Sequence, residues 1–532
     1  MNAGFVKYKS GFSVSKISYN LTEHILIKII QKYCKCRRFI SVKVLVLLFA
    51  ISSTNSYAQE MLGIVNSSRS GITGSMINPA VAVTSPFYID INILAVDIFA
   101  ENNFIYLAED EYQFKRFLMK DPQFPTHGVD NNLIVYDYYN KKDKKGYANF
   151  RLMGPSFSVT AGRHSFGLLT AARGIMSAKN LPYDIAKFGI EKLEYPPQYD
   201  INYVDNRNIY NAQMAWAELG FNYSYVFKQQ GLDYWAAGAT FKILRGYAGG
   251  YFNSDNVDYV VLDRDTLIVK NINAEAGYSL PLNYETNETM NSPLFRGKGV
   301  GFDLGVIYQK KKRYVRNDRT TKLCAQTYVP YKYKIGVSLL DIGRVKFTDN
   351  AEKLVFDEAS TYWPGITWID FTTIRDLTDT ISQQFYGNST ELIQGNEIKI
   401  ALPAAISIQA DINYAGNWYF NGTVVYPLQF SKTGLIRPVL FGLTPRYETE
   451  MFEVSLPITL YDWTKPRIGL SARFRGFFIG TEKLSGFFSF SDFTGLDFYA
   501  GLKLSLRKGD CRNKPADNCG MEEYKKYTKT KK

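Results

Sequence analysis

The chain is poor in the side chains that most enzymes and metal sites use. It has three His and five Cys among 532 residues, and only His127 and His164 lie beyond residue 58. Metal sites and Ser-His or Cys-His catalysis need more than two scattered imidazoles supply. Asp263 and Asp265 have neither a third ligand nor a glycine turn at calcium-loop spacing, so they are interpreted as solvated charge. The sequence therefore predicts no catalytic residue, no metal and no cofactor, and a protein that is not an enzyme.

Long hydrophobic runs are also missing. Beyond residue 58 no apolar stretch reaches the 18 residues, roughly, that a transmembrane helix needs, which excludes a helical membrane protein. A phosphate-binding Gly-x-x-x-x-Gly-Lys sequence is absent too, so an ATP-driven role is not expected.

The charge is unevenly distributed. The formal net charge is +13, but residues 1–58 hold nine Lys or Arg and one Glu, and residues 507–532 hold nine Lys or Arg and four acids. The body between them has 45 basic and 45 acidic residues and is neutral. A basic groove for nucleic acid is therefore not expected. The lysine-rich segment 507–532 is predicted to be a flexible tail, with anionic lipid headgroups or an acidic partner as the alternative role.

Residues 1–58 have the pattern of a secretory signal peptide with a long leader. Arg37, Arg38 and Lys43 precede the apolar run 44–51, and small residues follow at Ser56-Tyr57-Ala58. Cleavage is expected between Ala58 and Gln59. The apolar run is too short to span a bilayer, although a retained membrane anchor is the alternative reading.

Three cysteines remain after this cleavage: Cys324, Cys511 and Cys519. They are too few for a disulfide-stapled fold but are compatible with an oxidising compartment. Cys511 and Cys519 could form a bridge in the tail, or both could stay free, because sequence alone does not give the geometry that a disulfide needs.

Period-two alternation dominates the rest of the chain. Large apolar residues alternate with small or polar ones over stretches of about 9–11 residues, the length of a tilted strand that crosses a membrane. Examples of such stretches are residues 219–227, 406–414, 468–475 and 497–507. Aromatic residues make up 15% of the chain, and rings of Tyr, Trp and Phe at two membrane interfaces would explain that excess.

The predicted fold is all-β: a transmembrane antiparallel β-barrel over residues 87–506, with about 14 strands and a range of 12 to 16. A secreted β-sandwich or propeller is the alternative, but the strands are longer than globular sheets usually have. Because a barrel of this width does not close on its own side chains, its lumen needs a plug or inward side chains.

Long polar insertions interrupt the barrel, and residues 371–385 within the last of them are predicted to be helical. If the first strand, 87–96, runs outward, strand parity places most insertions on the periplasmic side. The insertions expected from composition are 109–149, 176–212, 249–297 and 343–401.

Several segments resemble one family. Gly71-Ile72-Thr73-Gly74-Ser75-Met76-Ile77-Asn78-Pro79-Ala80, followed by Phe87-Tyr88-Ile89-Asp90-Ile91-Asn92-Ile93, resembles the start of a family of Bacteroidota outer-membrane proteins of unknown function. The matching segments cover almost all of the mature chain. Later segments of the same kind are Gly154-Pro155-Ser156-Phe157, Lys242 to Gly249, Tyr333 to Gly343 and Asp497 to Lys503.

The Asn78-Pro79-Ala80 step is also similar to the N-terminal region of the long-chain fatty-acid transporter family, in which that region folds into the barrel as a plug. The resemblance implies a plug over residues 59–86 with a turn at Asn78 and Pro79. The alternative is that Asn-Pro only starts a turn before the first strand. The long insertions depart from the transporter family, so no substrate residue is carried over.

Two functions follow as hypotheses for a protein of the cell outer membrane, surrounded by outer-membrane lipids. The first is passive transport of a hydrophobic small-molecule ligand through the barrel. The second is a non-transporting scaffold for periplasmic or surface protein partners in secretion, surface attachment or motility, because the insertions exceed what a pore requires.

Overall fold

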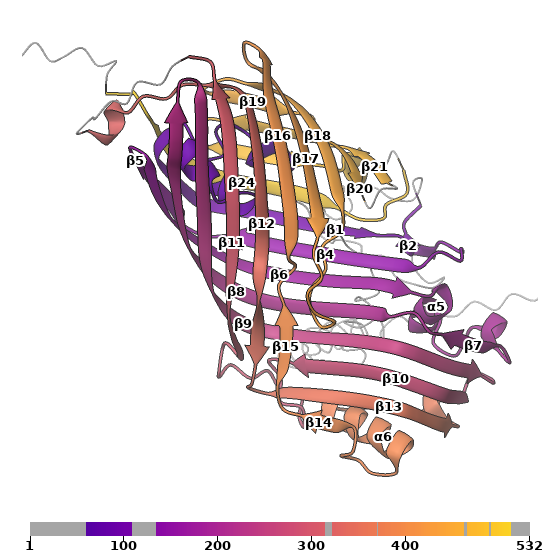
Figure 1. Ribbon diagram of the computed structural model, residues 1–532. Coiled ribbons are helices and arrows are strands. Elements are labelled where there is room, and N and C mark those ends of the chain that lie inside the picture. Colours follow the sequence, from indigo (N-terminus) through magenta and orange to yellow (C-terminus); the bar gives the residue numbers. More distant parts are fainter. Residues whose placement is uncertain are drawn as a thin grey trace, which may run out of the picture.

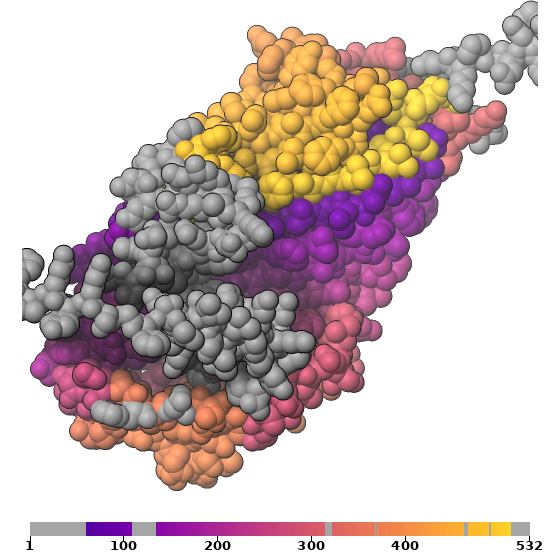
Figure 2. Space-filling model, turned by 180° about the vertical axis from the view of Figure 1, so that it is seen from behind, coloured from indigo at the N-terminus to yellow at the C-terminus, as the bar shows by residue number. Residues whose placement is uncertain are grey.

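The fold is one antiparallel β-sheet that closes on itself (Figure 1). The computed structural model describes residues 60–108, 135–313, 322–369, 371–461, 465–488 and 491–511. Its first strand, β1 (Phe87–Asn102), pairs along one side with the last, β24 (Asp497–Arg507). Along the other side it pairs with β4 (Lys144–Met153) and β5 (Ser156–Ala161). Figure 2 shows the C-terminal strands in yellow lying directly against the indigo first strand, where the barrel closes.

The chain crosses the closed barrel wall 14 times, which confirms the predicted fold class and strand number. We call each passage of the chain along the wall a crossing. Four crossings consist of two strands each, because a short break separates β4 from β5, β15 from β16, β19 from β20 and β21 from β22. The other strands of the wall are β6 (His164–Leu181), β8 (Ile209–Gln230), β9 (Asp233–Val261), β11 (Gly297–Lys311), β12 (Tyr331–Phe347), β15 (Ile398–Ala401), β16 (Ala405–Ala415), β17 (Trp418–Pro427), β18 (Leu440–Glu448), β19 (Phe452–Ser455), β20 (Ile458–Tyr461), β21 (Lys465–Ile468), β22 (Leu470–Phe474) and β23 (Phe477–Thr481).

Side-chain alternation gives the wall an apolar outer face and a polar inner face. In β8 the residues Phe221 and Tyr223 are 48% and 43% exposed, whereas Asn222 between them is buried. In β16, Ile408 is 45% exposed while Gln409 is buried against the contents of the lumen. This is the pattern of a barrel whose outer face contacts lipid. No helix among the described residues combines the length and apolar character that a bilayer crossing requires.

The two ends of the barrel differ. We call the end at which β1 begins and β24 ends the near end, and the opposite one the far end. Tight turns join strands at the near end, where Gly162, Gly231 and Gly416 take positive φ values of 61°, 57° and 54°. Glycine adopts this conformation without the steric cost that a Cβ brings.

The long insertions lie at the far end, opposite the start of β1. The sequence predicted that, if the first strand runs outward, most insertions lie on the periplasmic side, which is the side where that strand begins. This prediction is wrong, because they lie at the opposite end. The reason is that residues 144–161 form a complete return crossing, β4 and β5, which places the next short turn at the near end.

The wall extends beyond the barrel on one side of the far end. The strand β9 is 29 residues long; its first part pairs with β11 and its second part with β10 (Leu267–Ser279). Next to β10 lies β13 (Ala351–Trp363), followed by the short β14 (Ile393–Gly395). Three further short strands lie at the far end: β2 (Ile105–Tyr106), β3 (Tyr136–Asp137) and β7 (Asn202–Asp205).

Two helices cover this extension. The helix α6 (Ile374–Tyr386) fulfils the prediction of a helix within residues 371–385. Its N-cap Thr373 accepts a hydrogen bond from the Asp376 amide, and Gly387 ends it with a φ of 69°. The helix α5 (Tyr183–Glu191) packs with Leu193 and Tyr259 over β9 and β10. Among the described residues, four more short helices lie outside the lumen: η3 (Pro196–Gln198), η4 (Leu323–Ala325), η5 (Ile366–Trp368) and α7 (Ser485–Phe488).

A disulfide joins Cys324, in the loop between β11 and β12, to Cys511 after the last strand, with a Cα–Cα distance of 5.5 Å. The considered bridge between Cys511 and Cys519 is therefore wrong. The barrel wall brings Cys324 to the end of β24 from 187 residues away along the chain. Cys519 and the rest of the basic tail lie outside the described residues.

Candidate functional site in the barrel lumen

The residues between the predicted cleavage site and β1 lie inside the barrel. They form α3 (Leu62–Val65), η1 (Gly71–Met76) and α4 (Val81–Thr84). All of residues 60–85 are buried except Ser68, Arg69 and Met76, which are partly exposed. Ala58 and Gln59, the predicted cleavage pair, lie outside the described residues. We call residues 60–86 the N-terminal segment.

Asn78 and Pro79 sit where the N-terminal segment meets the wall. The Asn78 side-chain oxygen accepts a hydrogen bond of 3.0 Å from the Ala80 amide, which makes a local turn. The Asn78 amide nitrogen donates to Gln409 Oε1 at 3.1 Å, and the Asn222 amide nitrogen donates to the Pro79 carbonyl at 3.2 Å. The turn is thus hydrogen-bonded both to itself and to two wall strands.

Three wall glycines leave room for this turn, and we call them the glycine seat: Gly238, Gly305 and Gly336. Gly238 and Gly305 are direct partners in the pairing of β9 with β11. A Cβ on Gly238 would lie 2.6 Å from the Ala80 nitrogen, and a Cβ on Gly336 would lie 2.9 Å from Asn78 Nδ2. Both are shorter than real Cβ contacts. The contact at Gly238 is with the backbone, so a side chain there would displace the turn, whereas a side chain at Gly336 would displace the side chains of Asn78 and Gln409.

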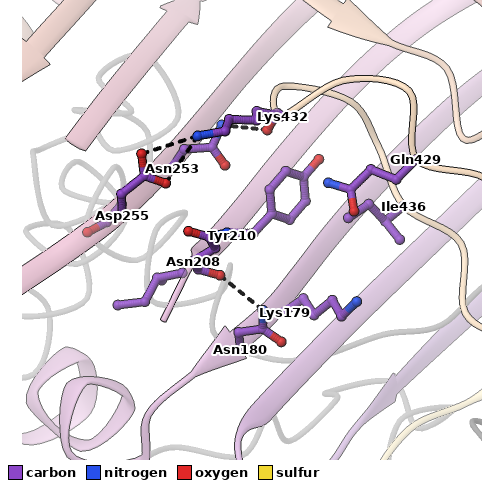
Figure 3. Close-up of a pocket in the computed structure, with 11 residues that line it drawn as sticks. Lys179, Asn180, Asn208, Tyr210, Asn253, Asp255, Gln429, Lys432 and Ile436 are labelled. Carbon is purple, nitrogen blue, oxygen red and sulfur yellow. Dashed lines mark hydrogen bonds and ion pairs between the residues drawn. The ribbon is translucent and has the colours of Figure 1, made fainter. Parts of the chain in front are cut away.

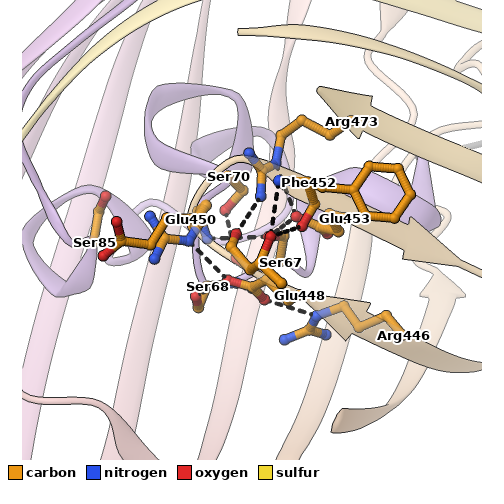
Figure 4. Close-up of polar contacts among 12 residues, drawn as sticks. Ser67, Ser68, Ser70, Ser85, Arg446, Glu448, Glu450, Phe452, Glu453 and Arg473 are labelled. Atoms are coloured by element: carbon orange, nitrogen blue, oxygen red, sulfur yellow. Dashed lines mark hydrogen bonds and ion pairs between the residues drawn. The ribbon is translucent and has the colours of Figure 1, made fainter. Parts of the chain in front are cut away.

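Ionic contacts hold the middle of the N-terminal segment (Figure 4). The Ser67 hydroxyl donates to Glu453 Oε2 at 2.9 Å, and the Ser68 hydroxyl donates to Glu448. Both carboxylates are fixed from the wall, since Arg473 Nε donates to Glu453 at 2.9 Å. Arg446 Nε likewise donates to Glu448 at 3.1 Å. These buried charges are therefore paired, as burial requires.

A second segment enters the lumen from the far end. Residues 428–439, between β17 and β18, form what we call the inward loop. The Leu435 amide donates to the Ala401 carbonyl at 2.9 Å, and the Ile436 amide donates to the Ser177 hydroxyl at 3.2 Å. Ser177 belongs to β6 and is well separated from β17 around the wall, so the loop bridges the lumen.

The inward loop meets the N-terminal segment at a set of charged residues that we call the central ionic cluster. Arg437 of the loop donates to Glu60 and also to Asp341 of β12. Arg173 forms a two-pronged pair with Asp341, with both hydrogen bonds at 3.0 Å. The cluster has three cations and three carboxylates, all buried: Arg173, Lys242, Arg437, Glu60, Asp303 and Asp341.

An apolar layer surrounds these charges. The wall contributes buried residues that face the lumen, and these pack in one cluster with Met61, Leu62 and Ile64 of the N-terminal segment. Leu435 of the inward loop belongs to the same cluster. Its wall members include the aromatic residues Phe99, Tyr147, Tyr210, Trp216, Tyr251, Phe347, Tyr461, Phe478 and Tyr499 and the aliphatic residues Met153, Ile175, Met214, Leu244, Ile400, Leu402, Val425 and Leu440.

The filled lumen leaves a cavity of about 110 Å³ at its far end (Figure 3). The start of β8 and the middle of β9 line it on one side, and the inward loop lines it on the other. The lining residues are Lys179, Asn180, Asn208, Ile209, Tyr210, Asn253, Ser254, Asp255, Gln429, Lys432 and Ile436.

The other residues singled out from the sequence lie elsewhere. His164 opens β6 at the near end, where its ring nitrogen lies 2.9 Å from the Tyr223 hydroxyl. Asp263 and Asp265 lie in the far-end turn between β9 and β10, where Asp263 accepts a hydrogen bond from the Asp265 amide. His127 is outside the described residues. Within the described ranges, no group of three His, Cys, Asp or Glu side chains could hold a metal.

The central ionic cluster was not predicted. Its only trace in the sequence is a charged residue at an inward position of an alternating strand, such as Lys242 or Asp303, and such residues also occur in soluble sheets. The charged residues that pair come from strands that are distant along the chain. The spacing of these residues in the sequence therefore does not predict the cluster.

Comparisons with known proteins give one family and several solved barrels. The crystal structure of the Ralstonia pickettii toluene transporter TbuX aligns with 10% identity over 82% of this chain and 94% of that chain, with a TM-score of 0.36. The Pseudomonas putida toluene transporter TodX aligns with 9% identity over 82% and 92%, with a TM-score of 0.33. For a Pseudomonas aeruginosa FadL homologue the values are 10%, 82%, 94% and 0.26.

No curated protein matches the sequence. A family model described as a family of unknown function (DUF5723) matches residues 79–482, from the Pro79 of the buried turn to the end of β23. This match spans more than half of the chain and confirms the predicted membership of a family without a known function. The chain belongs to the family of unknown function DUF5723.

Proposed function

We propose that the protein is an outer-membrane barrel that lets a small hydrophobic molecule cross the membrane passively, through a lumen gated by the N-terminal segment and the inward loop. The observation that carries the proposal is the meeting of these two segments at Arg437 and Glu60. Each segment is held in the lumen by side-chain contacts and a few isolated backbone hydrogen bonds and not by a continuous strand ladder. Such contacts can break without opening the wall, so the lumen can be unblocked while the barrel stays closed.

The apolar layer supports a hydrophobic permeant. Once the two segments separate, the side chains that now pack against Met61, Leu62 and Leu435 would line the free path. Apolar pockets with a few placed polar groups are the usual environment for such ligands. An ion or a sugar would instead have to cross Phe347, Leu402 and their apolar neighbours without compensating hydrogen bonds.

The proposed orientation has the near end in the periplasm. Tight turns at that end and long insertions at the other follow the usual rule for outer-membrane barrels. Exposed aromatic residues at the near end, such as Tyr414 and Trp418, suit a membrane interface. The signal-peptide pattern of residues 1–58 supports export.

Uptake of the hydrophobic fluorophore N-phenyl-1-naphthylamine by Gram-negative cells tests the proposal, because an intact outer membrane excludes it. We expect the wild-type chain to raise the initial uptake rate above the empty vector. A variant that lacks residues 60–76 should raise the rate further, and K228M, at an exposed near-end position, serves as the matched control. If the deletion variant is folded and present in the outer membrane but leaves uptake at the vector level, the transport proposal is wrong.

The far-end extension favours a second candidate function, a scaffold for a protein partner. The sheet formed by β9, β10 and β13 continues past the barrel and carries two helices, which passage through a pore does not require. Cross-linking in native membranes followed by mass spectrometry distinguishes the candidates. Loss of a cross-linked partner on deletion of residues 349–396, with unchanged fluorophore uptake, would support the scaffold.

A further inference from the structure

The connection between β11 and β12 gathers positive charge at the near end. Residues 310–332 hold eight Lys or Arg and one Asp, although the body of the chain has 45 residues of each sign. Four of these cations are exposed in the described part of the connection, and we call them the basic face: Lys312, Arg313, Lys322 and Lys332. None of the four forms an ion pair with another described residue.

The other side of the near end has its charges paired. Arg507, at the end of β24, forms ion pairs with Glu450 and, at 3.5 Å, with Asp510. Among the described residues from β16 to β24, Arg475 is the one exposed cation at this end without a carboxylate partner. The excess of positive charge therefore belongs to the side of β11 and β12 and is not a property of the whole end.

A row of outward-facing aromatic rings lies beside the basic face. The ring centroids of Trp235 and Tyr308 are 4.7 Å apart, and those of Tyr308 and Tyr333 are 5.9 Å apart. The row faces away from the lumen, since Ile307, the chain neighbour of Tyr308, is buried against the N-terminal segment. Lys332 directly precedes Tyr333 in the chain, so the basic face begins where the ring row ends.

The surroundings do not neutralise the basic face. Asp233 lies beside the ring row, but Lys310 already pairs with it at 2.9 Å. The disulfide between Cys324 and Cys511 ties the connection to the segment 507–532, which holds nine Lys or Arg and four acids. Positive charge thus meets more positive charge at this side of the near end, and an anion has to come from outside the chain.

We propose that the basic face binds the headgroups of anionic phospholipids in the leaflet that surrounds the near end, with the acyl chains against the ring row. Aromatic rings settle where headgroups meet acyl chains. Lys and Arg side chains directly beyond such rings reach the lipid phosphates and are attracted by the negative surface. A soluble acidic protein would match the charge but not the rings, which face the bilayer. The inference goes beyond transport and does not depend on what crosses the lumen.

Native mass spectrometry of the full mature chain in detergent, with its disulfide intact, tests the binding. The protein is mixed with equal amounts of phosphatidylglycerol and phosphatidylcholine that have the same acyl chains. We expect phosphatidylglycerol to be retained about tenfold over phosphatidylcholine at low salt. The variant K312Q/R313Q/K332Q should retain both lipids equally, and in the wild type high salt alone should remove the preference. Excess glycerol phosphate should not displace the lipid, because it has no acyl chains to contact the rings.

A matched control separates the basic face from a general loss of charge. The variant K141Q/K142Q/R264Q also removes two Lys and one Arg, but at exposed far-end positions, and should keep the preference. Heat-modifiable mobility in gels shows that each variant is folded. The inference is overturned if the folded wild type retains both lipids equally, if the basic-face variant keeps the wild-type preference, or if the far-end variant loses it to the same extent. Displacement of the lipid by glycerol phosphate would also overturn it, because the face would then bind phosphate and not a lipid.

Discussion

Asn78 rests directly on Gly305. The Asn78 side-chain oxygen occupies the space that a side chain at position 305 would need, and Pro79 Cδ would lie 2.9 Å from a Cβ there. The partner of Gly305 across the sheet, Gly238, makes the same approach to Ala80. The position of the N-terminal segment is therefore set by the absence of side chains on the wall as much as by hydrogen bonds.

The first prediction concerns this glycine seat. G305A should displace the Asn78–Pro79 turn and cost about 1–3 kcal/mol, the usual range for overpacking. Because the wall ladder is untouched, the barrel should stay folded while residues 60–86 become sensitive to protease. G422A is the matched control, since its Cβ would meet Leu443 at an ordinary 3.7 Å. Equal protection of the segment in both variants would show that the seat does not hold it.

The central ionic cluster gives the second prediction. R437M leaves Glu60 and Asp341 without one of their partners, and breaking a buried pair in this way costs about 3–5 kcal/mol. Urea unfolding in detergent measures the loss, and hydrogen exchange should show increased exchange in the inward loop and the N-terminal segment. The double variant R437M/E60Q also removes the charge of Glu60, which R437M leaves with Arg151 at 3.7 Å, and should recover part of the loss. Simple additivity of the two changes would contradict a direct pair.

The disulfide provides the third prediction. C324S should lower the free energy of unfolding by about 2–4 kcal/mol, because the bridge restricts the unfolded chain over 187 residues. C519S should have no such effect. Peptide mapping without reduction checks the pairing itself, and recovery of a Cys511–Cys519 peptide would refute it.

The fourth prediction concerns pH and the helix α5. Burial by itself lowers the pKa of Lys187, but hydrogen bonds to Asp137 at 2.9 Å and Glu191 at 3.0 Å outweigh it and hold the pKa above its ordinary value of 10.5. The ion pairs therefore stabilise α5 fully below pH 10.5, and this stabilisation is lost as the pH rises through the raised pKa.

K187M should remove about 1 kcal/mol of local stability at neutral pH. Hydrogen exchange in α5, measured between pH 8 and pH 11 and corrected for intrinsic rates, checks both statements. Protection should fall toward alkaline pH in the wild type and stay low and flat in K187M. A parallel fall in both proteins would mean that another group titrates.

The sequence by itself determined the class of fold. Phe221, Tyr223 and Ile408 face outward because alternation with a period of two is a local property, and any closed sheet places such residues on one face. The same pattern gave the number of crossings, since each one needs its own alternating stretch. The helix α6 could also be predicted from the sequence, because the residues that begin and end it, Thr373 and Gly387, are its direct neighbours in the chain.

Tertiary structure decided what fills the barrel. The pairing of Cys324 with Cys511, the contact of Arg437 with Glu60 and Asp341, and the seat of Asn78 on Gly305 all join residues far apart along the chain. Register and closure of the whole sheet set these distances. A local pattern shows which side of a strand a residue faces, but only the closed barrel determines which residue lies across the lumen from it.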